Sequence, residues 1–152
     1  MEEKKQILVV DDDRDILETL SDLLEHKGYT VDTAESGRDA IDKSKTSLYN
    51  LALLDIKLPD MEGTELLARL HETAPRMMKI MITGYPSLQN AIASLNLGAD
   101  AYILKPVNPK ELLKLVEQKL GEQSRAEMLS EDEVAKWIQD RLRKLGKQDK
   151  HE

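Results

Sequence analysis

Three consecutive carboxylates, Asp11, Asp12 and Asp13, directly follow the apolar run Ile7 to Val10. Adjacent acids repel one another, so they favour a compensating cation or a helix N-terminus close by. Asp13 is suited to capping a helix that begins near Arg14, which is the structural alternative for this residue. The same role explains Asp11 and Asp12 poorly. These two acids therefore indicate a cation site.

Asp55, Thr83 and Lys105 stand at the ends of three further strand-sized runs. If these runs pair as parallel strands, their polar ends meet at the carboxyl edge of the sheet, where such folds bind ligands. Convergent carboxylates are the ligands that a small, hard Mg²⁺ requires. The lysine supplies a point charge for a phosphoryl group or a carboxylate. The spacing thus favours a Mg²⁺ site with a lysine beside it.

The elements that must position these residues alternate along the first 120 residues. Five segments with helical spacing separate and follow five apolar or alternating runs. Continuous runs such as Ile7 to Val10 and Leu51 to Leu54 suit a parallel sheet covered on both faces. We predict an α/β fold with a doubly wound, five-stranded parallel sheet of flavodoxin-like order 2-1-3-4-5 and five helices. The predicted strands are Ile7 to Val10, Thr30 to Ala34, Leu51 to Leu54, Lys79 to Thr83 and Ala101 to Leu104.

A change in composition after Gly121 predicts a domain over residues 1–121 and a C-terminal extension over 122–152. Ser130 and Glu133 form a capping-box pattern, and Gly146 is suited to ending a helix. The expected amphipathic helix spans about 131–145, and its apolar stripe includes Trp137. A single stripe must be covered by the domain or by a second chain, while its basic end is most simply a solvated face.

Composition excludes several classes of function. The 152 residues include no cysteine, which rules out disulfides, thiolate zinc sites and thiol catalysis. A formal net charge of -7 disfavours direct binding to nucleic acid or anionic lipid. No apolar run approaches the ~20 residues that cross a bilayer, and the N-terminus does not resemble a signal peptide. We expect a cytoplasmic protein without a membrane partner.

Four motifs together resemble the receiver domain of two-component response regulators. The likeness covers about residues 6 to 120, and the joint occurrence is far more specific than any single motif. The motifs are Val-Val-Asp-Asp (Val9 to Asp12), Leu-Leu-Asp-Ile-Lys-Leu-Pro-Asp-Met-Glu-Gly (Leu53 to Gly63), Ile-Thr-Gly (Ile82 to Gly84) and Gly-Ala-Asp-Ala-Tyr-Ile-Leu-Lys-Pro (Gly98 to Pro106).

This resemblance implies that Asp55 is the phosphoacceptor and takes a phosphoryl group from a phosphohistidine of a sensor histidine kinase. It also implies that Asp11, Asp12, Asp55 and the Lys57 backbone carbonyl organise Mg²⁺. Of the carboxylates, Asp12 and Asp55 are expected to bind the ion directly and Asp11 through water. Such a protein accepts and slowly loses a phosphoryl group; it is not an enzyme that turns over a substrate.

The resemblance further implies a switch. Thr83 and Lys105 contact the phosphoryl oxygens, and Tyr102 rotates into the space that Thr83 leaves. The alternative for Tyr102 is a ring packed on its strand with the hydroxyl in water. The switched face comprises the fourth helix, fifth strand and fifth helix, and it binds a partner or a second copy; the C-terminal helix is another candidate for dimerisation. Tyr85 is expected to shield the phosphoryl group and slow its hydrolysis. The family also commonly has a cis peptide between Lys105 and Pro106.

Two other classes compete with this interpretation. A phosphatase with an aspartyl-phosphate intermediate would need its nucleophile after the first strand, far along the chain from Asp55. A flavodoxin-like cofactor binder would need hydroxyls, glycines and helix amides after that strand, where this chain has Asp11, Asp12 and Asp13. Turnover of a phosphate monoester, or a bound yellow cofactor, would favour one of these classes.

Overall fold

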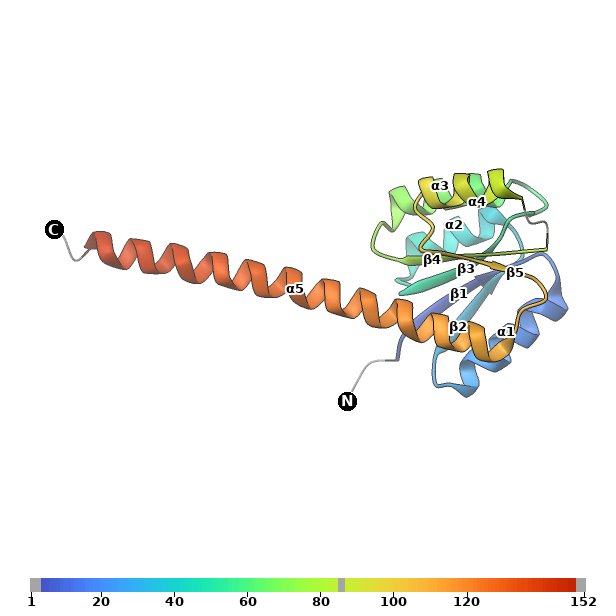
Figure 1. Ribbon diagram of the computed structural model, residues 1–152, viewed down its shortest axis with the longest axis horizontal. Helices are drawn as coiled ribbons and strands as arrows, with labels where there is room; N and C mark the ends of the chain where they lie inside the picture. Colours follow the sequence, from blue (N-terminus) through green and yellow to red (C-terminus); the bar gives the residue numbers. More distant parts are fainter. Residues whose placement is uncertain (1–3, 85–86, 150–152) are drawn as a thin grey trace. The chain divides into compact units, whose positions relative to one another are not determined.

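Strands and helices alternate through the computed structural model, which describes residues 4–84 and 87–149 (Figure 1). The strands are β1 (Gln6–Val10), β2 (Thr30–Ala34), β3 (Leu51–Asp55), β4 (Met78–Thr83) and β5 (Ala101–Leu104). The helices are α1 (Arg14–His26), α2 (Gly37–Thr46), α3 (Gly63–Thr73), α4 (Leu88–Asn96) and α5 (Pro109–Asp149).

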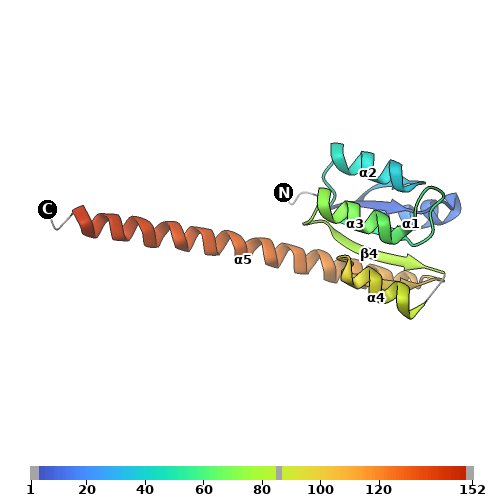
Figure 2. The same ribbon diagram turned by 90° about the horizontal axis from the view of Figure 1, so that it is seen from above.

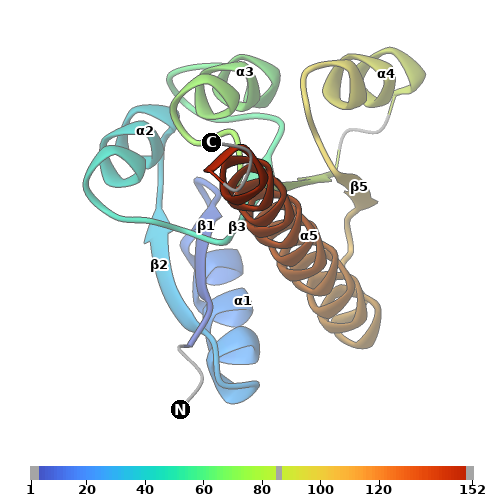
Figure 3. The same cartoon turned by 90° about the vertical axis from the view of Figure 1, so that its left-hand side faces the viewer.

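The five strands form one parallel sheet in the order β2-β1-β3-β4-β5. This confirms the predicted doubly wound, flavodoxin-like sheet. The continuous apolar runs marked the strands reliably because helices bury both faces of the central strands. Figure 3 shows α2, α3 and α4 on one face of the sheet and α1 on the other, and Figure 2 shows α2, α3 and α4 from above.

Alternate residues of each central strand enter two separate hydrophobic cores, one on each face of the sheet. Removing this apolar surface from water is the main stabilising contribution, at about 25 cal/mol per Å². The core beneath α2 and α3 includes Leu8, Val10, Leu54, Leu66, Leu67 and Leu70. The core beneath α1 and the start of α5 includes Ile7, Val9, Leu53, Leu17, Leu24, Leu112, Val116 and Leu120.

Side-chain caps fix where the helices begin. Ser36 accepts the Asp39 amide at 3.1 Å at the start of α2. Asn108 accepts the amides of Lys110 at 3.0 Å and Glu111 at 3.2 Å at the start of α5. Each cap satisfies amides that the first helical turn leaves without partners, so the loops after the strands end at defined positions.

The C-terminal region differs from the sequence prediction. A helix limited to about 131–145 is wrong, because α5 runs without a break from Pro109 to Asp149. Gly121 lies inside this helix; an interior glycine costs about 1 kcal/mol relative to alanine but does not end a helix. Ser130 and Glu133 also lie inside it, and a capping-box pattern acts as a cap only where the preceding residues are not helical.

The chain divides into two compact units with the boundary between Leu120 and Gly121. The first unit contains the sheet and both cores. In the second unit, every residue from 125 to 146 is exposed. Among the described residues, no helix has the length and apolarity needed to cross a membrane.

Candidate functional site

Three carboxylates, Asp11, Asp12 and Asp55, form an acidic cluster where β1 and β3 end. Val10 pairs with Leu54, so Asp11 and Asp55 leave neighbouring strands at the same level. Ligand oxygens of the three residues lie within 4.8 Å of one another. Asp11 is 3% exposed and Asp55 is 6% exposed, whereas Asp12 is exposed. The structure therefore brings together the three acids that the sequence singled out, in a place where their mutual repulsion is only partly screened by water.

Lys105 reaches the acidic cluster from the end of β5. Its Nζ donates to Asp11 Oδ2 at 2.9 Å and to Asp55 Oδ2 at 3.5 Å. Burial alone would lower the pKa of Lys105, but the hydrogen bonds and charges of Asp11 and Asp55 outweigh it and raise this pKa. The ammonium group is thus held in its charged form, and it compensates one of three negative charges. The Lys105-Pro106 peptide bond is cis.

The Asp55 carboxylate lies in surroundings that oppose its charge. Burial raises the pKa of Asp55 and the Asp11 charge raises it further, while Lys105 and a hydrogen bond from the Lys57 backbone act in the opposite direction. Asp55 Oδ1 is buried and has no hydrogen-bond partner among the described residues. A buried carboxylate oxygen without a donor is costly unless another group satisfies it. This oxygen therefore fits a cation or an incoming electrophile.

The donor set of the cluster fits a hard divalent cation such as Mg²⁺, which prefers carboxylate and carbonyl oxygens. The oxygens of Asp11 already have partners, because Oδ1 accepts the Asp13 amide at 2.9 Å and Oδ2 accepts Lys105. The unpartnered oxygen belongs to Asp55, and the exposed carboxylate belongs to Asp12.

Asp13 caps α1, which confirms the structural alternative for this residue. Its Oδ1 accepts the amides of Asp15 at 2.9 Å and Ile16 at 3.4 Å, and α1 begins at Arg14. Asp13 thus fixes the start of the helix that follows β1, while Asp11 and Asp12 lie in the acidic cluster with Asp55.

Thr83 and Tyr102 occupy neighbouring strands. Thr83 is completely buried at the end of β4, and its carbonyl accepts the Lys105 amide at 2.8 Å. The Tyr102 ring packs against the core beneath α2 and α3. Its hydroxyl is buried without a hydrogen-bond partner in the described part of the chain, so the alternative of a hydroxyl in water is wrong. Tyr85 lies outside the described residues.

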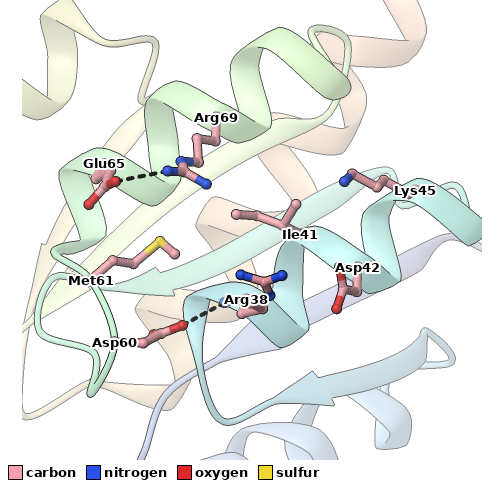
Figure 4. Close-up of a pocket in the computed structure, with 8 residues that line it drawn as sticks. All are labelled: Arg38, Ile41, Asp42, Lys45, Asp60, Met61, Glu65 and Arg69. Carbon is pink, nitrogen blue, oxygen red and sulfur yellow. Dashed lines mark hydrogen bonds and ion pairs between the residues drawn. The ribbon is translucent and has the colours of Figure 1, made fainter.

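Asp60, which the sequence did not single out, holds the loop between β3 and α3 against α2. Its Oδ2 accepts the Arg38 amide (Figure 4) and its Oδ1 accepts the Gly37 amide, each at 2.9 Å. Hydrogen bonds from the Arg38 and Gly37 backbone lower the pKa of Asp60. The contact joins residues 22 and 23 positions apart and uses backbone donors, so no local spacing reveals it.

The same loop carries Lys57, and Gly63 closes it. Gly63 donates its amide to the Ile56 carbonyl at 2.5 Å, and Lys57 and Glu62 form an isolated bridge between them. A Cβ atom at Gly63 would overlap the Asp55 carbonyl, which explains why glycine stands where α3 begins. The loop is therefore fixed at both ends beside Asp55.

The model of the response regulator receiver domain family matches residues 7–117, and the chain belongs to this family. Its relatives include the transcriptional regulatory protein DltR of Streptococcus agalactiae serotype III, which is 41% identical over 108 residues, covering 71% of this chain and 48% of DltR. The chain thus spans about half the length of the curated relatives it matches.

Solved structures show the same likeness. A CheY-like response regulator receiver domain protein from Methanospirillum hungatei JF-1 has a TM-score of 0.81 and 52% identity, covering 82% of this chain and 99% of that chain. A response regulator protein from Burkholderia pseudomallei, crystallised with a phosphorylated aspartic acid, a calcium ion and citrate, has a TM-score of 0.72 and 29% identity, covering 84% of this chain and 75% of that chain.

Proposed function

We propose that Asp55 accepts a phosphoryl group from a phosphohistidine of a sensor histidine kinase in a reaction that depends on Mg²⁺. The observation that carries this proposal is the buried, unpartnered Asp55 Oδ1 beside Lys105 and two further carboxylates. The phosphorylated aspartic acid and calcium ion in the Burkholderia pseudomallei relative support it.

In the proposed transfer, an Asp55 carboxylate oxygen attacks the phosphorus atom. An O–P bond forms, the P–N bond to the histidine breaks, and its electron pair returns to the imidazole. Phosphoryl transfer needs mainly positioning and charge stabilisation from a protein. Lys105, already charged and within 3.5 Å of Asp55 Oδ2, balances charge on the phosphoryl oxygens. Thr83 is proposed to donate a hydrogen bond to the same oxygens.

Asp12, Asp55 and the Lys57 carbonyl would hold Mg²⁺, with Asp11 acting through water. The hydrogen bonds that already occupy Asp11 support this division of roles. When bound, the ion neutralises charge between the carboxylates and the incoming phosphoryl group. Lys105 compensates one carboxylate in its absence, and the remaining acids disfavour an anionic donor until the cation is present.

We propose that phosphorylation is sensed through Thr83 and Tyr102 and changes the face formed by α4, β5 and α5. Tyr102 already packs inward, which places its ring next to the core rather than in solvent. On the same elements Ile92 is 50% exposed, Leu95 55% and Leu104 50%. This apolar surface is suited to a partner protein or a second copy, whose binding would shift a two-state equilibrium.

The kinase would approach beside α1. A groove of about 350 Å³ adjoins Lys105, and its lining is mostly apolar. It is lined on one side by Ile16, Leu20 and Leu23 and on the other by Pro106 and Val107. A groove of this kind accepts an apolar helix face next to the phosphoryl donor. We infer a cytoplasmic protein that functions as a phosphoacceptor and loses its phosphoryl group slowly, with Tyr85 as the proposed shield.

The proposal is tested by labelling the chain with a small acyl phosphate donor and Mg²⁺ and measuring the intact mass. Wild-type protein should gain one phosphoryl group, and Asp55→Asn should gain none. Asp13→Asn is the matched control, because asparagine also caps helices well and Asp13 lies outside the acidic cluster. Stoichiometric labelling of Asp55→Asn would contradict the assignment.

A further inference from the structure

The extension after Gly121 carries an apolar stripe without cover in the described residues. Val134, Ile138, Leu142 and Leu145 recur at the spacing that places side chains on one face of a helix. Their exposures are 55%, 46%, 62% and 51%, respectively. Trp137 beside them is 63% exposed and lies under the Arg141 guanidinium, 5.7 Å from the ring centroid. Most helices in water depend on packing of such a face for their stability.

The charges of the extension are separated along the helix. Residues 127–133 contain four acids and no base, while residues 141–147 contain four bases and no acid. The two segments have equal length and lie symmetrically about Trp137. Their centres are 14 residues apart, which is about 21 Å along a helix. This exceeds the Debye length of about 8 Å at physiological ionic strength, so the two segments interact weakly within one chain.

From this symmetry we infer that the extension pairs in antiparallel orientation with the extension of a second copy of the chain. A twofold axis near Trp137 places residues 127–133 of one copy opposite residues 141–147 of the other, at both ends of the pair. Packed helices lie about 8–10 Å apart, within the range of electrostatic attraction. A parallel pair would instead oppose acid to acid and base to base.

A second copy fits this surface better than an unrelated partner. The charge pattern of the helix is complementary to the same pattern read in the opposite direction, as a twofold interface requires. The stripe overlaps the basic segment, and with the axis near Trp137 its last residue, Leu145, lies opposite Leu129 of the other copy, which is 63% exposed. One pairing therefore covers apolar residues and matches the charges. The inference is independent of phosphorylation at Asp55, and it adds a second contact to the proposed face of α4, β5 and the part of α5 before Gly121.

Sedimentation of the full chain at two ionic strengths tests the inference. At about 0.01 M the Debye length is about 30 Å, and at about 1 M it is about 3 Å. We expect a dimer whose dissociation constant rises about tenfold or more at the higher salt concentration. The Asp55→Asn chain should dimerise to the same extent. A monomer at both concentrations, or association that strengthens with salt, would overturn the inference.

Charge reversal supplies a matched pair of variants. One chain carries Glu131→Lys, Asp132→Lys and Glu133→Lys, and the other carries Arg141→Glu, Arg143→Glu and Lys144→Glu. Each variant alone should be monomeric, and a mixture should form a mixed dimer. Circular dichroism of each variant checks that the helix is kept. Dimers of either variant alone would contradict the charge pairing.

Cross-linking distinguishes the two orientations, since the chain contains no cysteine of its own. In the antiparallel pair, position 128 of one copy lies opposite position 146 of the other. Met128 is 63% exposed, and an added Cβ at Gly146 meets nothing within 4 Å. After mixing Met128→Cys and Gly146→Cys chains, a short cross-linker should join the two variants to each other. Products that join only identical chains would indicate a parallel pair and overturn the inference.

Discussion

At the residue level, the acidic cluster is held in an electrostatically unfavourable state that suits the proposed phosphoryl transfer. Asp55 is nearly buried, faces the Asp11 charge, and has an oxygen without a donor among the described residues. A group whose folded pKa is raised reduces stability as the pH rises from its unfolded pKa through the folded value. Ionised Asp55 therefore costs stability at neutral pH when no cation is bound.

Replacing Asp55 by asparagine should stabilise the metal-free protein at neutral pH. The change removes a buried charge that repels Asp11 and keeps a side chain of similar size. We expect the free energy of unfolding to rise by about 1 kcal/mol, the usual scale for a single substitution. Urea denaturation in EDTA measures this, with Asp13→Asn as the control. An equal or lower stability of Asp55→Asn would show that Asp55 is not destabilised by its surroundings.

Magnesium should stabilise the wild-type protein through the acidic cluster. A ligand that binds only the folded state at 100 times its dissociation constant adds about 2.7 kcal/mol to the free energy of unfolding. Asp12→Asn should lose most of this gain, because an exposed ligand is removed from the cluster. Asp13→Asn should keep it. Thermal unfolding of each variant with Mg²⁺ and with EDTA measures this gain. An undiminished Mg²⁺ response in Asp12→Asn would contradict the proposed ligand set.

At the scale of elements, the structure joins two features that the sequence separates. The loop beside Asp55 is fixed by Gly63 at the start of α3 and by Asp60 at the start of α2. The strands and the meeting of Asp11 with Asp55 could be predicted, because continuous apolar runs mark buried parallel strands and their carboxyl ends share one edge. The contact of Asp60 with α2 could not be predicted, because it is a long-range hydrogen bond to backbone amides. The length of α5 could not be predicted either. The capping-box pattern of Ser130 and Glu133 indicated a helix start, but these residues lie inside a helix that continues through them.

Asp60→Ala should lower stability by about 1 kcal/mol at pH 7, as loss of a helix cap does. Because the folded pKa of Asp60 is lowered, its contribution is complete above the ordinary carboxyl pKa of about 3.9 and is lost as the pH falls through the lowered folded value. The difference between wild type and Asp60→Ala should therefore shrink in strong acid.

Urea denaturation from pH 7 down into this acid range measures the difference. Asp42→Ala is the matched control, since Asp42 lies on α2 and lines the same pocket as Asp60 (Figure 4). A difference between wild type and Asp60→Ala that stays constant down to the lowest pH would show that the Asp60 charge does not contribute. Weaker Mg²⁺ stabilisation in Asp60→Ala would indicate that the loop also positions Lys57.

At the scale of the whole molecule, the two units have different physical characters. The first has two cores and the acidic site, while the second has its apolar residues exposed and its charges segregated. The acidic and basic side chains number 21 and 15 before Gly121 and 8 and 7 from there on. The net charge of -7 thus belongs almost entirely to the unit that contains the acidic cluster.

A chain of residues 1–124 should fold and keep its Mg²⁺ response, because Leu112, Val116 and Leu120 complete the core beneath α1. We expect the Mg²⁺-dependent gain in the free energy of unfolding to match that of the full chain within about 0.5 kcal/mol. Thermal unfolding with and without Mg²⁺ measures it. Loss of folding or of the Mg²⁺ response in this shorter chain would show that the site depends on the extension.

Phosphorylation of Asp55 is tested by locating the phosphoryl group after labelling with a small acyl phosphate donor and Mg²⁺. Reduction of the acyl phosphate with borohydride marks the modified aspartate, and peptide mass spectrometry then identifies it. We expect the mark to fall on Asp55 and to be absent when EDTA replaces Mg²⁺. A mark on Asp11, Asp12 or Asp13, or labelling that is unaffected by EDTA, would contradict it.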